Sequence, residues 1–169
     1  VEVLGETLGF TDVRTLRTRI GYSSAKLADL IRPDLSITDV VVTAKHGALA
    51  PWWHTYKTTD YEKAVGLLTR VGCNHLLDRR YGTLASGERK RVELARALMA
   101  DPGILLLDEA IAGLDLGGRE ALIASLGSLA EKDTTPPTIL VTHHVDEIPP
   151  GFSHLLLLRG GVVQAAGPI

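Results

Sequence analysis

The sequence has 169 residues, of which 45% are hydrophobic, and its 18 basic and 20 acidic residues nearly cancel to a net charge of -2. That length and apolar content predict one folded domain and exclude an intrinsically disordered chain. The near-neutral charge argues against a nucleic-acid partner, and the single cysteine, Cys73, excludes an internal disulfide framework and fits a reducing compartment. No apolar run reaches the roughly 18 residues that span a bilayer, and the chain does not begin with a signal peptide.

The first half of the chain is predicted to be mainly helical. Turn residues and apolar spacing predict, in chain order, a strand at 1–4, a helix at 13–19 capped by Asp12, a strand at 20–24, a short helix at 25–31, a helix at 40–45 opened by 36–39, an irregular segment at 46–59 and a long amphipathic helix that Asp60 caps and Gly72 ends.

The second half alternates strands and helices. Its pattern predicts a helix at 86–99, a strand at 104–107 buried on both faces, a helix at 119–130, a second buried strand at 138–142 and a hairpin formed by 155–158 and 162–165. This order predicts an α/β fold with a helical insertion over about residues 26–100.

The clearest chemical feature is the pair Asp108–Glu109, which directly follows the apolar run 104–107. A buried strand that ends in two acids places both carboxylates at the carboxyl edge of a sheet, where open α/β sheets bind ligands. The first acid can hold Mg²⁺, and the second can polarise a water for attack on a phosphate. Taken alone, the same pattern also fits an apolar strand followed by an ordinary acidic turn.

Three further motifs accompany this pair in the sequence. The turn Leu84–Glu88 opens a helix, where free backbone N–H groups form an anion site. The turn Ala112–Asp115 follows the two acids, and the strand at 138–142 ends in His143 and His144, of which one could contact a terminal phosphate. Each has a plain structural alternative: a Ser/Gly helix cap, a loop, and a structural histidine. The histidines show no metal-ligand spacing.

Together, and in this order, the motifs resemble those of the ATP-binding-cassette (ABC) ATPases. The run 83–115 is similar to the signature helix, Walker B strand and D-loop of that family, and 138–147 resembles its switch-histidine segment. The run 155–167 resembles the closing hairpin, and 1–21 resembles the segment between the Walker A helix and the Q-loop, so the resemblance covers nearly the whole chain.

The resemblance implies a P-loop NTPase-like core sheet with a helical subdomain, divided into residues 1–25, 26–100 and 101–169. It implies that the parent protein binds ATP and Mg²⁺, hydrolyses ATP as a head-to-tail dimer and energises a transmembrane permease from the cytoplasmic face of the membrane. The residue roles that it implies are Asp108 for Mg²⁺, Glu109 as catalytic base, His143 as switch histidine, Ala85, Ser86, Gly87 and Glu88 as the signature presented to ATP on the partner, and Asp115 at the dimer seam.

Several positions depart from the family pattern. The Walker A pattern GxxxxGK[ST] occurs nowhere in the sequence, so we expect that the chain begins after it and is inactive alone. Ala25 stands near the expected Q-loop glutamine, Ala85 replaces the signature serine, and Ala110 replaces the usual proline. The alternatives are a non-catalytic interaction module and a non-transport ABC ATPase. Because the Walker A strand would lie beside the strand of Val141, we also expect either self-association through an uncovered sheet edge or a rearranged sheet.

Overall fold

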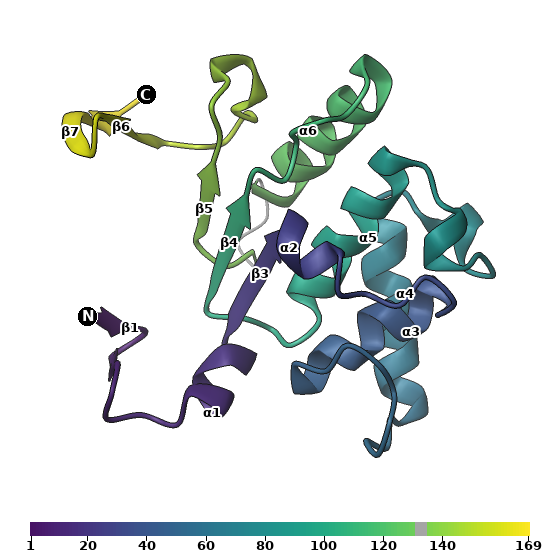
Figure 1. Ribbon diagram of the computed structural model, residues 1–169. Helices are drawn as coiled ribbons and strands as arrows, with labels where there is room; N and C mark the ends of the chain where they lie inside the picture. Colours follow the sequence, from purple (N-terminus) through teal and green to yellow (C-terminus); the bar gives the residue numbers. More distant parts are fainter. Residues whose placement is uncertain (131–134) are drawn as a thin grey trace.

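The computed structural model describes residues 1–130 and 135–169, and Figure 1 shows their arrangement. Its strands are β1 (Glu2–Val3), β2 (Glu6–Thr7), β3 (Ile20–Ser24), β4 (Ile104–Asp108), β5 (Thr138–Val141), β6 (His154–Arg159) and β7 (Val162–Pro168). Its α-helices are α1 (Val13–Thr18), α2 (Ala25–Ala28), α3 (Ile37–Val42), α4 (Thr58–Arg70), α5 (Ser86–Leu98) and α6 (Leu116–Ala130). The 3-10 helices are η1 (Thr43–His46), η2 (Asn74–Leu76), η3 (Tyr81–Thr83) and η4 (Val145–Glu147).

A parallel sheet with the strand order β3-β4-β5 forms the centre of the molecule. Its register places Ser24 opposite Asp108, and Asp108 opposite Val141. Because the strands are parallel and end at the same level, the residues that follow them meet at one edge of the sheet. The predicted α/β architecture with a parallel sheet is therefore present.

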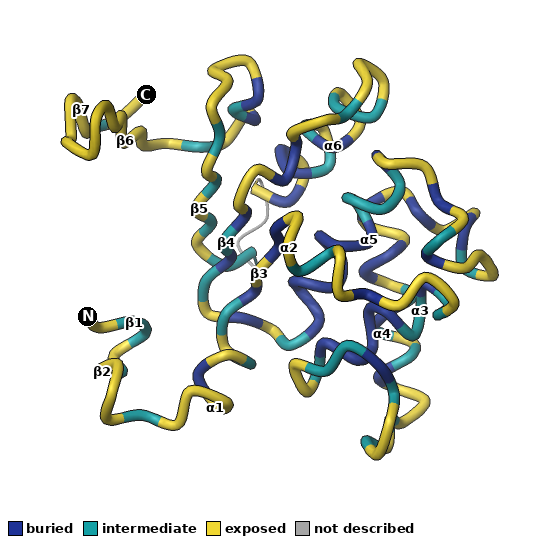
Figure 2. The backbone as a smooth tube through the Cα atoms, viewed as in Figure 1, coloured by how far each residue is buried: buried dark blue, intermediate teal, exposed yellow. Residues whose placement is uncertain are grey.

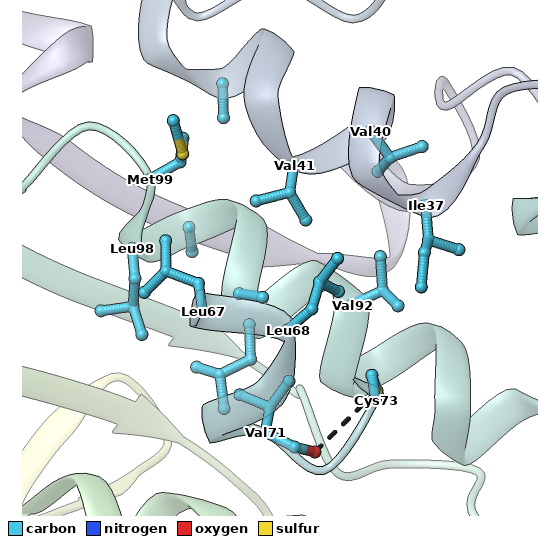
Figure 3. Packing of buried hydrophobic residues seen from close by; sticks show 14 of the residues in the cluster. Ile37, Val40, Val41, Leu67, Leu68, Val71, Cys73, Val92, Leu98 and Met99 are labelled. Carbon is cyan, nitrogen blue, oxygen red and sulfur yellow. Dashed lines mark hydrogen bonds between the residues drawn. The ribbon is translucent and has the colours of Figure 1, made fainter. Parts of the chain in front are cut away.

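Helices α3, α4 and α5 pack on one another, and α5 also packs against β3 and α6 (Figure 1). Figure 3 shows the apolar core between these helices, with Ile37, Leu68 and Val92 among its fully buried side chains. Helix α5 approaches β3 so closely that a Cβ on Gly21 would lie 2.5 Å from the carbonyl oxygen of Ala97. Glycine at this position therefore lets the helical part sit directly on the sheet.

The prediction that 138–142 is a strand buried on both faces is wrong. Ile139 and Val141 of β5 are 51% and 47% exposed, and within the described part of the chain β5 pairs only with β4. The apolar sequence of β5 has the composition of a covered strand, but no described element lies over its second face. The predicted hairpin is confirmed as β6 and β7, and both of its faces are largely exposed (Figure 2).

Three predicted boundaries differ from the structure because local hydrogen bonds set them. Helix α4 begins at Thr58, so Asp60 is inside its first turn, where it accepts a hydrogen bond from the Lys57 backbone N–H at 2.9 Å. Helix α6 begins at Leu116 and not at 119, because Asp115 caps it. Helix α2 ends at Ala28 and continues only as tighter i→i−3 turns.

The remaining differences are smaller. The strand predicted at 1–4 is one arm of a two-residue hairpin, turned by Leu4 and Gly5 with positive φ angles of 52° and 77°. The helix predicted at 40–45 begins at Ile37 as α3, and the 3-10 helix η1 continues it from Thr43. Among the described residues, no helix has both the length and the apolar character needed to cross a bilayer.

Candidate active site at the sheet edge

Asp108 and Glu109 stand at the carboxyl end of the central strand β4. Asp108 is the last residue of the strand and is exposed. Glu109 has a left-handed backbone, with φ of 51°, and its N–H donates to the carbonyl oxygen of Val141 at 3.0 Å. Few non-glycine residues adopt this conformation, and those that do often lie at functional sites. The turn thus fixes the backbone of Glu109 against β5 while its side chain remains open to solvent.

His143 contacts Glu109 from the neighbouring strand end. Its Nε2 lies 2.8 Å from the Glu109 Oε1, and the two side chains are 75% and 50% exposed. An ionised carboxylate only accepts hydrogen bonds, so Nε2 carries the proton in this contact. The structure therefore brings together an acid and a histidine that are 34 residues apart in the sequence, beside the exposed Asp108.

Ser24 lies next to this group on the other side of β4. It ends β3 directly opposite Asp108, and its Oγ accepts a hydrogen bond from the Leu27 N–H at 3.3 Å, which caps α2. The sequence analysis did not single out Ser24, although its position at a strand end was a usable signal. Because Ser24 caps α2, Ala25, at the expected position of the Q-loop glutamine, is the first residue of that helix.

The donor set at this edge suits Mg²⁺ better than a metal that needs a full protein cage. Among the described residues, no group of three or more His, Cys, Asp or Glu side chains could hold a metal ion. Mg²⁺ usually takes only one or two carboxylates and completes its shell with waters and substrate phosphates. The exposed carboxylate of Asp108, close to the hydroxyl-bearing Ser24, fits that manner of binding.

A second group of predicted site residues lies at the start of α5 and α6. Ser86 is the first residue of α5, and the Glu88 carboxylate turns back to accept a hydrogen bond from the Ala85 N–H at 2.8 Å. Ala85 has no side-chain acceptor, so only this half of a capping box is made. A Cβ on Gly87 would lie 3.0 Å from the Cα of Gly118 in the first turn of α6, so the two helix starts touch.

Asp115 belongs to this second group. Its Oδ1 accepts a hydrogen bond from the Gly118 N–H at 2.9 Å and caps α6. Close to it, Arg119 of α6 forms an ion pair with Asp146, which lies in the switch-histidine segment and whose pKa this guanidinium lowers. The predicted site residues therefore form two groups, one at the strand ends and one at the helix starts. The Arg119–Asp146 ion pair connects α6, which starts in the second group, to the segment that follows β5. The sequence analysis missed this ion pair, which no local pattern signals.

A buried carboxylate joins α5 to the sheet. Glu93, 6% exposed, accepts a hydrogen bond from the Tyr81 hydroxyl at 2.7 Å and a longer one from the Ser23 hydroxyl at 3.5 Å, and it lies 3.5 Å from Lys90 Nζ. Burial, and then the charge of Glu93, raise the pKa of Tyr81. This network fixes the helix that carries the Ser86 turn relative to the strand that ends at Ser24. Sequence reasoning did not find it, because Ser23 and Glu93 meet only in space.

Comparison with known proteins identifies the family to which this chain belongs. Residues 1–112 match the family model described as "ABC transporter". The chain belongs to the ABC transporter family. The recognition of an ABC ATPase from its motifs is thereby confirmed, and those motifs include the signature turn, the two acids and part of the D-loop within the matched range.

Two relatives with curated descriptions are similar to the chain over different lengths. The chain is 40% identical over 170 residues to the ABC transporter ATP-binding protein YlmA of Bacillus subtilis, and the match covers 100% of the chain and 64% of YlmA. The molybdenum import ATP-binding protein ModC of Brucella suis is 39% identical over 114 residues, which cover 68% of the chain and 31% of ModC. The chain thus spans less than two thirds of these relatives.

The fold is that of the ABC cassettes. A dimeric ATP-binding cassette in a post-hydrolysis state, bound to ADP and Pi, matches with a TM-score of 0.75 and 20% identity over 98% of the chain and 71% of the cassette. The predicted ABC ATPase fold is therefore confirmed. The division of the chain at residues 25 and 100, and the roles of the individual site residues, stay predictions.

Proposed function

We propose that the protein to which this chain belongs hydrolyses ATP and uses it to drive transport through a membrane permease. The observation that carries the proposal is the 2.8 Å contact between Glu109 and His143, beside Asp108 at the carboxyl edge of a parallel sheet. An acid, a histidine and a Mg²⁺-compatible carboxylate at this edge suit in-line attack of water on a phosphate. Family membership supports the same reaction, because the relatives are described as ATP-binding.

Each residue of the first group takes one part of this reaction. Glu109 accepts a proton from the attacking water, so that the oxygen can bond to the terminal phosphorus as the bond to the leaving ADP oxygen breaks. His143 positions that water and contacts the transferred phosphate. Asp108 helps to hold Mg²⁺, which when bound neutralises charge on the phosphates.

The second group would face a nucleotide held by another subunit. The start of α5, with Ala85, Ser86, Gly87 and Glu88, presents free backbone N–H groups at the positive end of a helix, where phosphate binds favourably. Asp115 would lie near the seam between the subunits. The dimeric state of the structurally similar cassette supports a head-to-tail pair of this kind.

The remaining parts of the proposal concern partners and location. The helical segment 26–100 would contact the permease, which would place the protein at the cytoplasmic face of the membrane. The 169-residue chain by itself would not turn over ATP, because its sequence lacks the GxxxxGK[ST] loop that grips the phosphates.

The experiment compares Mg²⁺-dependent phosphate release by the natural full-length protein and by its Glu109→Gln and His143→Ala variants. We expect Glu109→Gln to lower kcat by roughly 10²–10⁴-fold, since a positioned general base contributes about that much, while ATP binding persists. Glu62→Gln, on the exposed face of α4, serves as the control and should leave kcat unchanged. Full turnover by Glu109→Gln would contradict the assigned role, and turnover by the 169-residue chain would contradict its proposed inactivity.

A further inference from the structure

The loop after η1 carries an aromatic stack that the ATPase assignment does not use. The rings of His46 and His54 are stacked, with centroids 4.5 Å apart and planes inclined by 14°. Tyr56 lies 5.5 Å from His46, and Trp53 lies 5.7 Å from His54. The segment 46–56 is thus a loop whose two ends are held together by a pair of imidazoles.

Fixed charges hold the loop on both sides of this pair. Lys45 donates to both carboxylate oxygens of Asp60, at 2.7 and 2.8 Å, and so joins η1 to α4. The buried guanidinium of Arg96 donates to the carbonyl oxygen of Ala48 at 2.7 Å. Neither contact involves an imidazole, whereas the stack consists of two of them. The histidine pair is therefore the titratable part of an otherwise permanent attachment.

The surroundings of the stack favour neutral imidazole. Loss of water around the ring lowers the pKa of His46 below its ordinary value of 6.5, and the neighbouring His54 and Lys45 lower it further, while Asp60 opposes them. Tyr56, which packs on the stack, has its own pKa raised by burial and so stays neutral throughout this range. Tyr61 and Asp39 lie beyond Tyr56, where the Tyr61 hydroxyl donates to Asp39.

Two protonated rings at this separation repel each other. Positive charge on both rings therefore acts against the stacked arrangement. The sign follows from the lowered pKa of His46: the stack contributes its full stability above pH 6.5 and loses it as the pH falls from 6.5 through the lowered value.

We propose that the loop 46–56 is a pH-sensitive switch in which protonation of the stacked His46 and His54 releases the segment that carries Trp52 and Trp53. In the closed state both tryptophans are already largely exposed, at 66% and 77%, but held in one geometry. In the open state the loop stays attached through Arg96 and Lys45 and loses its internal order. This switch is a property of the chain itself and does not depend on ATP hydrolysis.

The chain contains its own reporter, because Trp52 and Trp53 are its only two tryptophans. Tryptophan fluorescence anisotropy of the 169-residue chain, measured from pH 8 to pH 5 at one protein concentration, therefore reports on this loop, with the His54→Phe variant as the reference for overall tumbling. We expect a fall in anisotropy with a midpoint below pH 6.5. A flat anisotropy across this range would overturn the proposal.

Three variants separate the switch from other effects of acid. His54→Phe keeps a stacking ring that cannot be charged, so the fall should disappear. His54→Gln removes the ring, so anisotropy should be low already at pH 8. His75→Gln alters an exposed histidine in η2 and should behave as the unchanged chain does. If His54→Phe follows the same pH curve as the unchanged chain, the stacked pair is not the switch.

Discussion

Asp60 shows how one carboxylate can serve two purposes in this molecule. It accepts hydrogen bonds from the Lys57 N–H in the first turn of α4 and from the Lys45 ammonium group of η1. The Lys45 contact, followed by the backbone hydrogen bond, lowers the pKa of Asp60 below its ordinary value of 3.8. The ionised form is therefore favoured in the folded state, which links the stability of this region to pH.

We expect Asp60→Asn to destabilise the chain at pH 7 and to reduce its sensitivity to acid. A lowered pKa gives stability that is present above the unfolded value of 3.8 and lost as the pH falls through the folded value. Asparagine does not ionise, so the variant lacks this contribution at every pH. The urea midpoints of the variant and of the unchanged chain should therefore converge below pH 3.8. The exposed Asp78→Asn serves as the control, and equal stability of the Asp60 variant and the unchanged chain at pH 7 would contradict the expectation.

At the level of residues, the sequence was informative for polar side chains that directly follow a strand. Asp108, Glu109 and His143 were predicted to lie together, and they do, because parallel strands bring their carboxyl ends to one edge. Ser24 and Glu93 were not predicted as part of the site region. Their contacts depend on which strand pairs with β4 and on how α5 is rotated, and neither is encoded within a local window of sequence.

Between elements, β3 and α5 approach each other closely at Gly21. A Cβ at this position would meet the Ala97 carbonyl oxygen at 2.5 Å and the Leu105 side chain at 2.9 Å. Backbone cannot move aside as a flexible side chain can, so the helix would have to shift from the sheet.

We expect Gly21→Ala to lower the free energy of unfolding by about 1–3 kcal/mol, the usual cost of overpacking. The matched control is Gly66→Ala in α4, where an added Cβ meets nothing within 4 Å. That change should be stabilising by about 0.4–1 kcal/mol, because alanine restricts the unfolded chain. Urea denaturation of the two variants provides the comparison, and a Gly21→Ala midpoint at or above that of the unchanged chain would argue against a close β3–α5 contact.

The existence of the longer elements was predictable, and the ends of α5 and β4 were predicted to within one residue, but the starts of α4 and α6 were not. The apolar spacing of α4 and α5 and the apolar run of β4 gave the correct element types. The starts of α4 and α6 were each misplaced by three residues. Each start depends on a carboxylate, Asp60 or Asp115, whose position relative to the helix the sequence does not fix: one lies inside the first turn and the other before it.

At the scale of the whole molecule, the backbone groups on the outer edge of β5 have no neighbouring strand among the described residues. Within the described part of the chain, β5 pairs with β4 alone, and its side chains Ile139 and Val141 are exposed. Figure 1 shows the β6–β7 hairpin standing apart from the sheet, so it does not cover this edge. Unpaired backbone groups beside apolar side chains favour pairing with a second copy.

We therefore predict that the 169-residue chain self-associates through β5, with a molar mass by light scattering that rises with concentration. Ile139→Lys should lower this association, because a lysine on an edge strand opposes strand pairing. Val145→Lys adds the same charge at an exposed apolar residue outside the strand and serves as the control. A concentration-independent monomer would contradict the prediction.

The same edge explains the largest error in the sequence-based fold. An apolar run such as that of β5 shows that a strand is suited to cover on both faces, but not that the chain supplies the cover. The sequence therefore predicted burial, whereas the structure shows a strand with the composition of an inner position at the border of the sheet.

The left-handed backbone of Glu109 has a consequence for how this position can vary. Glycine would adopt its φ of 51° at little cost, and the observed glutamate holds it at some expense of conformational energy. Selection for thermal robustness alone would thus draw this position toward a residue without a carboxylate. Glycine here would relieve the backbone strain but would remove the carboxylate that contacts the His143 imidazole across the strand ends.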